Sequence, residues 1–235
     1  MVRRRPGLRS LCLGLGSASL LAPASSDRWQ RHLVGTGNAT EMVVSFSTPQ
    51  ACPGCAVRLT SHPAVPPFPT TASTLDPNVA WTCTTLPKPN GSSHPAPTLH
   101  FHDAKLTGLA PNAEYAYVVG SDDAGWSAPA NFTTADPRVF AIVADFGHQR
   151  SAPRTHTALR ALTRDHKVDA VIHAGDFAYD FEGEYFKGPF DGSSGDRFME
   201  QIGTYASSVP YFPCPGNHET CHDNYTHYNA LPERS

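Results

Sequence analysis

The sequence predicts two domains of different class: an all-β sandwich over residues 28–136 and the first half of an α/β domain over residues 137–235. The first part contains short runs of alternating apolar and polar residues between Gly/Pro-rich loops, a pattern typical of an antiparallel sandwich. After Asp136-Pro137 the pattern changes to continuous apolar runs separated by a helix-like segment, which indicates parallel strands. A chain of 235 residues with 40% hydrophobic content can bury a core in both domains.

The strands of the first domain follow one another from Glu41 to Ala135. In "EMVVSFST", Met42, Val44 and Phe46 share one face, and five further runs repeat this pattern: "AVRLTS", "VAWTCTTL", "TLHFHDAKL", "AEYAYVVGS" and "ANFTT". Two proline-rich stretches, 62–77 and 87–97, are expected to be surface loops because they exclude helices and central strands. The segment "LTGLAPNAEYAYVV" resembles the turn and tyrosine-bearing strand of a fibronectin type III module. We expect no catalytic residues in this domain.

Three buried strands and one helix are predicted in the second domain. The strands are "RVFAIVADFG", "VDAVIHAGD" and "SVPYFPCPGNHE", and "THTALRALTRDHK" is the helix between the first two. Ligands of such sheets gather outside the carboxyl ends of the strands. These ends are Asp145, Gly175-Asp176 and Gly216-Asn217-His218.

The polar residues at these strand ends predict a metal site. A single Asp at the end of a strand is usually a cap or turn residue, but three consecutive strands each deliver a donor to the same edge. Asp176 and Tyr179 are three residues apart, so a short turn can direct both side chains toward one ion. Carboxylate and phenolate oxygens suit trivalent iron, and the amide oxygen of Asn217 suits a divalent metal. With Asp176 as the bridge, two ions would clamp the oxygens of a phosphate group.

The ordered motifs "ADFG", "GDFAYD", "GDRFM", "PYFPCPGNHE" and "NYTHY" resemble those of an animal-type purple acid phosphatase, in the metallophosphoesterase superfamily. Related serine/threonine phosphatases have D-x-H as the first motif, whereas here the third position is Gly147 and Tyr179 supplies the missing donor. His148 lies one residue further on, and its spacing is wrong for a ligand.

The resemblance implies a role for each residue of these motifs. Asp145, Asp176 and Tyr179 would bind ferric iron, and Asp176 and Asn217 would bind the divalent zinc, iron or manganese. His218 would hydrogen-bond the phosphate and protonate the leaving alkoxide, while Glu219 would support the shell. The implied reaction is hydrolysis of a small phosphate monoester at acid pH by a metal-bound hydroxide. Charge transfer from the Tyr179 phenolate to iron would explain the family's colour, and His173 is expected to pack in the core.

Two departures from the family pattern stand out. Ala144 replaces the usual Gly of the first motif, and the chain reaches Ser235 before the family's V-x-x-H and G-H-x-H motifs, which supply three further ligands. We therefore expect a chain truncated at its C-terminus, with little phosphatase activity from residues 1–235 alone. The alternative is a non-catalytic fragment that retains a β-sandwich interaction module. A phosphodiesterase or nucleotidase of the same superfamily is a third reading, against which Tyr179 argues.

The N-terminus resembles a secretory signal over residues 1–24, with a basic start, an apolar stretch and an A-x-A pattern. An unusual disordered leader is the alternative. Secretion or the lysosomal route agrees with four N-x-S/T sequons, at Asn38, Asn90, Asn131 and Asn224. A net charge of −3 gives no reason to expect a nucleic-acid partner, and the apolar stretch is too short to insert into a membrane.

Of six cysteines, Cys12 would leave with the signal, so an odd number remains. Cys52-Pro-Gly-Cys55 is a C-x-x-C motif. A zinc ribbon needs a second such pair, and a thioredoxin-like motif should open a helix, whereas a strand is predicted after Cys55. We expect a structural disulfide or a turn.

Overall fold

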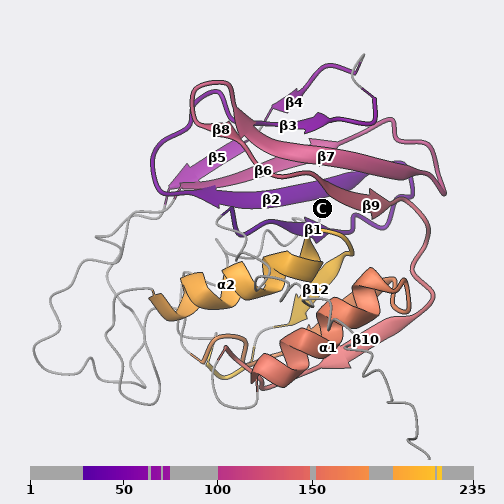
Figure 1. Ribbon diagram of the computed structural model, residues 1–235, viewed down its shortest axis with the longest axis vertical. Helices are drawn as coiled ribbons and strands as arrows, with labels where there is room; N and C mark the ends of the chain where they lie inside the picture. Colours follow the sequence, from indigo (N-terminus) through magenta and orange to yellow (C-terminus); the bar gives the residue numbers. More distant parts are fainter. Residues whose placement is uncertain are drawn as a thin grey trace, which may run out of the picture.

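The computed structural model describes residues 29–62, 65–69, 71–74, 100–148, 152–179, 193–214 and 216–218. Figure 1 shows a β-sandwich stacked on a smaller α/β unit. Several predictions fall outside the described residues: the signal over 1–24, the strand "VAWTCTTL", the proline-rich stretch 87–97, the sequons at Asn90 and Asn224, and Glu219. Within the described part of the chain, no helix is both long and apolar enough to cross a bilayer.

The sandwich consists of two antiparallel sheets. The first has the order β1-β2-β6-β5, from His32–Val34, Met42–Thr48, His100–Leu106 and Thr71–Thr74. The second has the order β4-β3-β7-β8, with β9 also paired to β7, from Phe68–Pro69, Ala56–Leu59, Glu114–Ser121, Gly125–Trp126 and Ala130–Thr133. The alternation in β2 is confirmed, since Met42, Val44 and Phe46 are buried in the core between the sheets.

The prediction that residues 62–77 form only surface loop was wrong. This stretch contains β4 and β5, each of which lies at the edge of its sheet. An edge strand tolerates proline, because the missing N–H would face away from the sheet. The exclusion of central strands from this stretch therefore holds.

Two local features of the sandwich agree with the sequence. The hydroxyl of Tyr115 accepts a 2.7 Å hydrogen bond from the backbone N–H of Ala110, which is the tyrosine corner expected of a fibronectin type III-like strand. Cys52 and Cys55 form a disulfide, and strand β3 rather than a helix follows it. Both cysteines are buried in the sandwich core, so the structural role predicted for this pair is confirmed.

The α/β unit is a three-stranded parallel sheet in the order β10-β11-β12, from Phe140–Val143, Ala170–Ala174 and Tyr211–Cys214. Helix α1 (Ala152–Arg164) joins β10 to β11, and α2 (Ser193–Ala206) lies between β11 and β12 in sequence. Both helices pack on the inner face of the sheet and form one core with it. This core includes Leu159 of α1 and Val171 and Tyr211 of the sheet. The predicted β-α-β arrangement is confirmed.

Strand β10 was expected to be buried and is not. Phe140 is 43% and Ile142 72% exposed, while Ala141 and Val143 pack against the core. The strand lies at the edge of its sheet, and among the described residues α1 and α2 cover only the inner face. An apolar run cannot by itself distinguish an edge strand with one covered face from a central strand with two.

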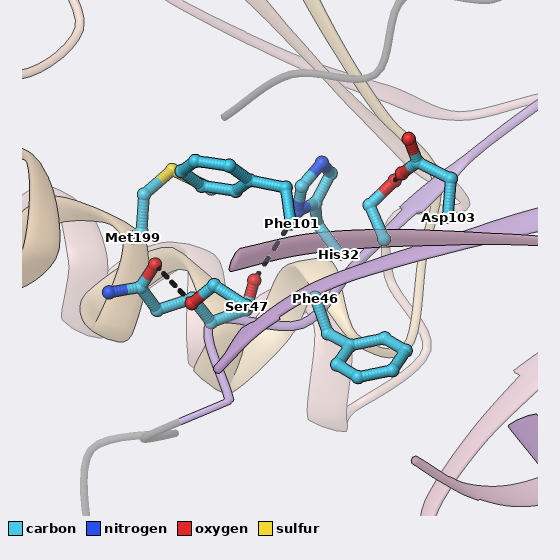
Figure 2. A pocket seen from close by; sticks show the side chains of 8 residues that line it. His32, Phe46, Ser47, Phe101, Asp103 and Met199 are labelled. Carbon is cyan, nitrogen blue, oxygen red and sulfur yellow. Dashed lines mark hydrogen bonds between the residues drawn. The ribbon is translucent and has the colours of Figure 1, made fainter. Parts of the chain in front are cut away.

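The two units meet along the outer face of the first sheet, where α2 and β12 pack on β1 and β6. Phe101 of β6 belongs to the core of the α/β unit, and Figure 2 shows it beside Met199 of α2. The Gln30 side-chain amide donates a 3.0 Å hydrogen bond to Asp196 at the start of α2. Leu33 of β1 forms a β-bridge with Pro210, just before β12.

Candidate metal centre

The parallel register brings the three predicted strand ends to one edge of the sheet. Val143 is paired with His173, and Ala174 with Cys214, so all three strands end at nearly the same level. The residues that follow β10 and β11 are also hydrogen-bonded to each other: the backbone N–H of Asp145 donates a 3.1 Å hydrogen bond to the carbonyl of Gly175. The sequence-based placement of these ends side by side is therefore correct.

Four of the predicted site residues are in contact at this edge. The Tyr179 hydroxyl donates to Oδ1 of Asp145 at 3.4 Å, and the backbone N–H of His218 donates to Oδ1 of Asp176 at 3.2 Å. The ring centroids of Tyr179 and His218 are 4.9 Å apart, so the pair Tyr179–Asp145 lies beside the pair His218–Asp176. Asn217 is exposed in the same turn as His218.

Three of these residues share an unusual backbone conformation. Asp145, Asp176 and Tyr179 have φ angles of 54°, 53° and 53°, in the left-handed region. Non-glycine residues adopt this region rarely, and for a bulky side chain such as tyrosine it is a true outlier. Such a residue costs on the order of 1–3 kcal/mol, and such strain concentrates at functional sites. Aspartate tolerates the region better than tyrosine does, so the cost is greatest at Tyr179. Gln30, Asn112 and His166 have the same conformation elsewhere in the described chain, so what distinguishes this edge is that three such residues gather there.

Two glycines make room for the candidate ligands. A Cβ atom on Gly216 would lie 2.6 Å from the backbone nitrogen of Asp176 and would also overlap its carboxylate. Gly147 has a φ of +57°, and a Cβ atom there would lie 3.2 Å from Cδ2 of Tyr179. Glycine at these positions lets the turns close around the Asp176 and Tyr179 side chains.

The donor set fits hard metal ions. Asp176 and His218 are each 8% exposed, whereas Asp145 is open to solvent, so the cluster has a protected side and an accessible side. Within the described ranges, no three His, Cys, Asp or Glu side chains gather into a group that could hold a metal ion. The other oxygen donors that the described residues bring to this edge are the phenol of Tyr179 and the amide of Asn217, in addition to the two carboxylates. Oxygen donors of these kinds suit ferric iron and divalent metals.

The other two histidines considered from the sequence lie behind this edge. His173 is fully buried, its ring is stacked on Phe146 with centroids 4.5 Å apart, and its Nδ1 contacts the hydroxyl of Tyr211. Burial lowers the pKa of His173 to about 3, so the ring is neutral and packs as predicted. His148 is buried, with its Nδ1 3.4 Å from Oγ of Ser194 in α2.

Sequence reasoning missed His156, which contacts the loop that carries Asp145. It lies in α1, where His156, Leu159 and Thr163 form the buried stripe, and its Nε2 is 3.0 Å from the carbonyl of Gly147. A histidine within the apolar stripe of an amphipathic helix was the available signal.

Comparisons with known proteins match both units. Residues 29–134 match the purple acid phosphatase N-terminal domain, and residues 138–234 match the calcineurin-like phosphoesterases. The chain is 38% identical over 137 residues to acid phosphatase type 7 of Danio rerio and 36% identical over 138 residues to that of Homo sapiens. Each alignment covers 56% of this chain and 29% of the relative, so the aligned part spans less than a third of these proteins.

The chain belongs to the purple acid phosphatase family. The same fold occurs in a purple acid phosphatase from yellow lupin (Lupinus luteus) seeds, with a TM-score of 0.63 and 23% identity over 81% of this chain and 35% of that one. The relatives that match are named acid phosphatases, and the family matched by the second unit is one of phosphoesterases.

Proposed function

We propose that this chain supplies metal ligands and an acid catalyst to a phosphatase that hydrolyses small phosphate monoesters at acid pH. The observation that carries the proposal is the convergence of Asp145, Asp176 and Tyr179 at one sheet edge, all three in the left-handed conformation. The gathering of three such residues, each with a hard oxygen donor, supports a ligand role over that of isolated turn residues.

The proposed ligand roles are those that the family resemblance implies, and donor type and position support them. Asp145, Asp176 and Tyr179 would hold ferric iron, and Asp176 and Asn217 would hold a divalent zinc, iron or manganese ion. A bound pair of this kind supplies an activated water and neutralises charge on the phosphate oxygens. The hydroxyl oxygen of Tyr179 lies 3.4 Å from Oδ1 of Asp145, to which it donates its proton in a hydrogen bond. The phenol would lose this proton on binding a metal as phenolate.

His218 is proposed to handle the phosphate and the leaving group. Its backbone N–H is anchored on Asp176, and its ring lies 4.9 Å from that of Tyr179, so the imidazole is held beside the candidate ligands. From there a protonated ring nitrogen would donate to a phosphate oxygen and transfer its proton to the leaving alkoxide. Glu219 is the next residue and is proposed to support this shell.

The proposal includes passage through the secretory or lysosomal route, with residues 1–24 as the signal. Asn131 is exposed on β9, and Asn38 lies in a turn where its Oδ1 accepts hydrogen bonds from the backbone and hydroxyl of Thr40 at 3.0 and 2.9 Å. Both asparagines are proposed as glycosylation sites, together with Asn90 and Asn224.

The test uses the full-length protein loaded with iron and zinc, assayed with p-nitrophenyl phosphate at mildly acidic pH. Asp176→Asn should lower kcat/KM by at least about 100-fold, because the bridge to both ions is weakened, and should reduce the bound metal. Asp123→Asn, at an exposed position in the sandwich, is the matched control and should change neither quantity. Full activity and metal content in Asp176→Asn would contradict the proposal.

The role of His218 is separable from that of the ligands. His218→Asn should keep the bound metal but lower kcat, and it should do so more for an alkyl phosphate than for p-nitrophenyl phosphate. A poor leaving group needs protonation, whereas p-nitrophenolate leaves with less help. An equal loss on both substrates would remove the acid role from His218.

A further inference from the structure

We propose that His156 is a positioning residue that holds the Asp145–Gly147 loop in the conformation in which Asp145 is presented at the sheet edge. This inference rests on the proposed function, in which Asp145 is a metal ligand. It concerns a helix residue that lies outside the sequence motifs of the site. Its basis is a pair of hydrogen bonds that determine the state of the imidazole ring.

Each nitrogen of the His156 ring has a partner from a different element. Nε2 lies 3.0 Å from the carbonyl oxygen of Gly147, and Nδ1 lies 3.2 Å from the hydroxyl of Tyr205 in α2. A carbonyl oxygen only accepts, so the proton of the ring must be on Nε2. The ring therefore donates to the loop.

The bond to Gly147 sets the direction of the bond to Tyr205. Burial lowers the pKa of His156 to about 4, so the ring is neutral and its Nδ1 carries a lone pair. Burial also raises the pKa of Tyr205, so the phenol keeps its proton and donates it to Nδ1. The chain Tyr205 O–H to His156 to Gly147 C=O thus runs in one direction. A tautomer with the proton on Nδ1 would lose the bond to Gly147 and reverse the bond to Tyr205, whose hydroxyl oxygen can also accept.

The same ring also supports the side chain in the middle of the loop. Phe146 packs edge-on against His156, with centroids 4.9 Å apart, and stacks on His173 at 4.5 Å. The loop is therefore held at two consecutive residues, by the ring of Phe146 and by the carbonyl of Gly147. Asp145 precedes them in its strained conformation, and Gly147 lies against Tyr179. A change at His156 should reach both candidate iron ligands through these two residues.

A purely structural role for His156 makes a different prediction. Leu159 lies one turn further along α1, is 3% exposed and belongs to the same core. If His156 only fills space between the helices, His156→Leu and Leu159→Ala should have the same kind of effect: lower stability with an unchanged loop. If His156 positions the loop, only His156→Leu should alter the metal centre.

The first experiment needs no metal. Nitrogen-15 NMR of the histidine rings in the full-length protein, with the His156 signals assigned from their loss in His156→Gln, should show a neutral ring with its proton on Nε2 between pH 6 and 8. A proton on Nδ1, or a mixture of tautomers, would overturn the inference, whether or not the protein is a phosphatase.

The second experiment measures Fe(III) affinity and the visible absorption of the iron complex. His156→Leu should weaken Fe(III) binding by about 10- to 100-fold and shift the absorption band, as outer-shell substitutions do. His156→Gln, which can still donate a side-chain N–H to Gly147, should recover most of the affinity. Leu159→Ala should lower Tm and leave both readouts unchanged.

Equal effects of His156→Leu and Leu159→Ala on Fe(III) affinity would overturn the positioning role. If the wild-type protein binds no Fe(III), the proposed function fails, and the inference is then decided by the NMR tautomer together with the loop amide shifts. In that case the Asp145 and Tyr179 amides should move in His156→Leu and stay in place in Leu159→Ala; the reverse pattern would overturn it.

Discussion

The hydroxyl of Tyr117, in the core of the β-sandwich, donates a 2.9 Å hydrogen bond to the backbone carbonyl of Ser207 in the turn after α2. That turn leads into β12, the strand whose end carries Asn217 and His218. The β-bridge between Leu33 and Pro210 fixes the same connection from the first sheet. The described part of the sandwich contributes no residue to the candidate site, yet it anchors the strand that leads to two of the proposed site residues.

Tyr117→Phe should lower the free energy of unfolding by about 1 kcal/mol, because the buried carbonyl of Ser207 loses its donor while the ring remains. The ring still packs edge-on against Phe132, so the sandwich core should be preserved. Urea denaturation would measure the loss. Wild-type stability in this variant would show that the bond does not tie the two units together.

Residues 28–136 expressed alone should fold as a β module, because the two sheets share one core that is separate from that of the α/β unit. Circular dichroism would test this, and a helical or unfolded spectrum would count against the boundary. The excised module should also be poorly soluble, since Phe101 loses its cover. Phe101→Ser should improve the solubility of the module and destabilise the whole chain.

The iron-loaded full-length protein should be purple, and Tyr179→Phe should bleach it, because the phenolate is the charge-transfer donor in the proposed iron shell. Visible absorption at equal iron content is the measurement. Tyr115→Phe is a suitable control, since that hydroxyl belongs to the tyrosine corner of the sandwich. Unchanged colour in Tyr179→Phe would place the iron ligand elsewhere.

Acid should destabilise the sandwich through His32. Burial lowers the pKa of this residue from 6.5 to about 4, so the folded chain binds fewer protons here than the unfolded chain. The contribution of the neutral ring to stability is complete above pH 6.5 and is lost as the pH falls from 6.5 toward 4. Each such histidine adds at most about 1.4 kcal/mol per pH unit to the slope.

His32→Leu should therefore flatten the dependence of the unfolding free energy on pH between 6.5 and 4, measured by urea denaturation at several pH values. His62→Leu is the matched control, because His62 is exposed in the same domain. If the pH slope of His32→Leu equals that of His62→Leu and of the wild type, His32 does not cause the loss of stability in acid.

The parts of the fold that sequence predicted best are those with a clear period. The alternation of Met42, Val44 and Phe46 and the parallel strands ending at Asp145 and Asp176 are present as expected. Strands β1 and β8 have three and two residues, which is too short for a period to be visible. Helix α2 was not predicted, although Phe198, Ile202 and Tyr205 recur at helical spacing.

The candidate site was predictable as a set of residues at one sheet edge and not as a geometry. Its members follow strand ends, and the topology of a parallel sheet brings those ends together. The left-handed conformation of Tyr179 could not be predicted, because local preference opposes it and only the surrounding turns impose it. The hydrogen bond from His156 to Gly147 could not be predicted either, because the two residues belong to different elements and only the packing of α1 brings them into contact.

The left-handed backbone conformation of Asp145 and Asp176 determines which substitutions can test their role in metal binding. Aspartate and asparagine tolerate that conformation better than most residues, whereas alanine does not share the preference. Substitution by alanine would therefore change two properties at once: it removes the candidate ligand and it disfavours the left-handed backbone conformation. Replacement of each carboxylate by its amide removes the charge and leaves the turn intact, so it is the substitution from which a change in metal binding can be interpreted directly.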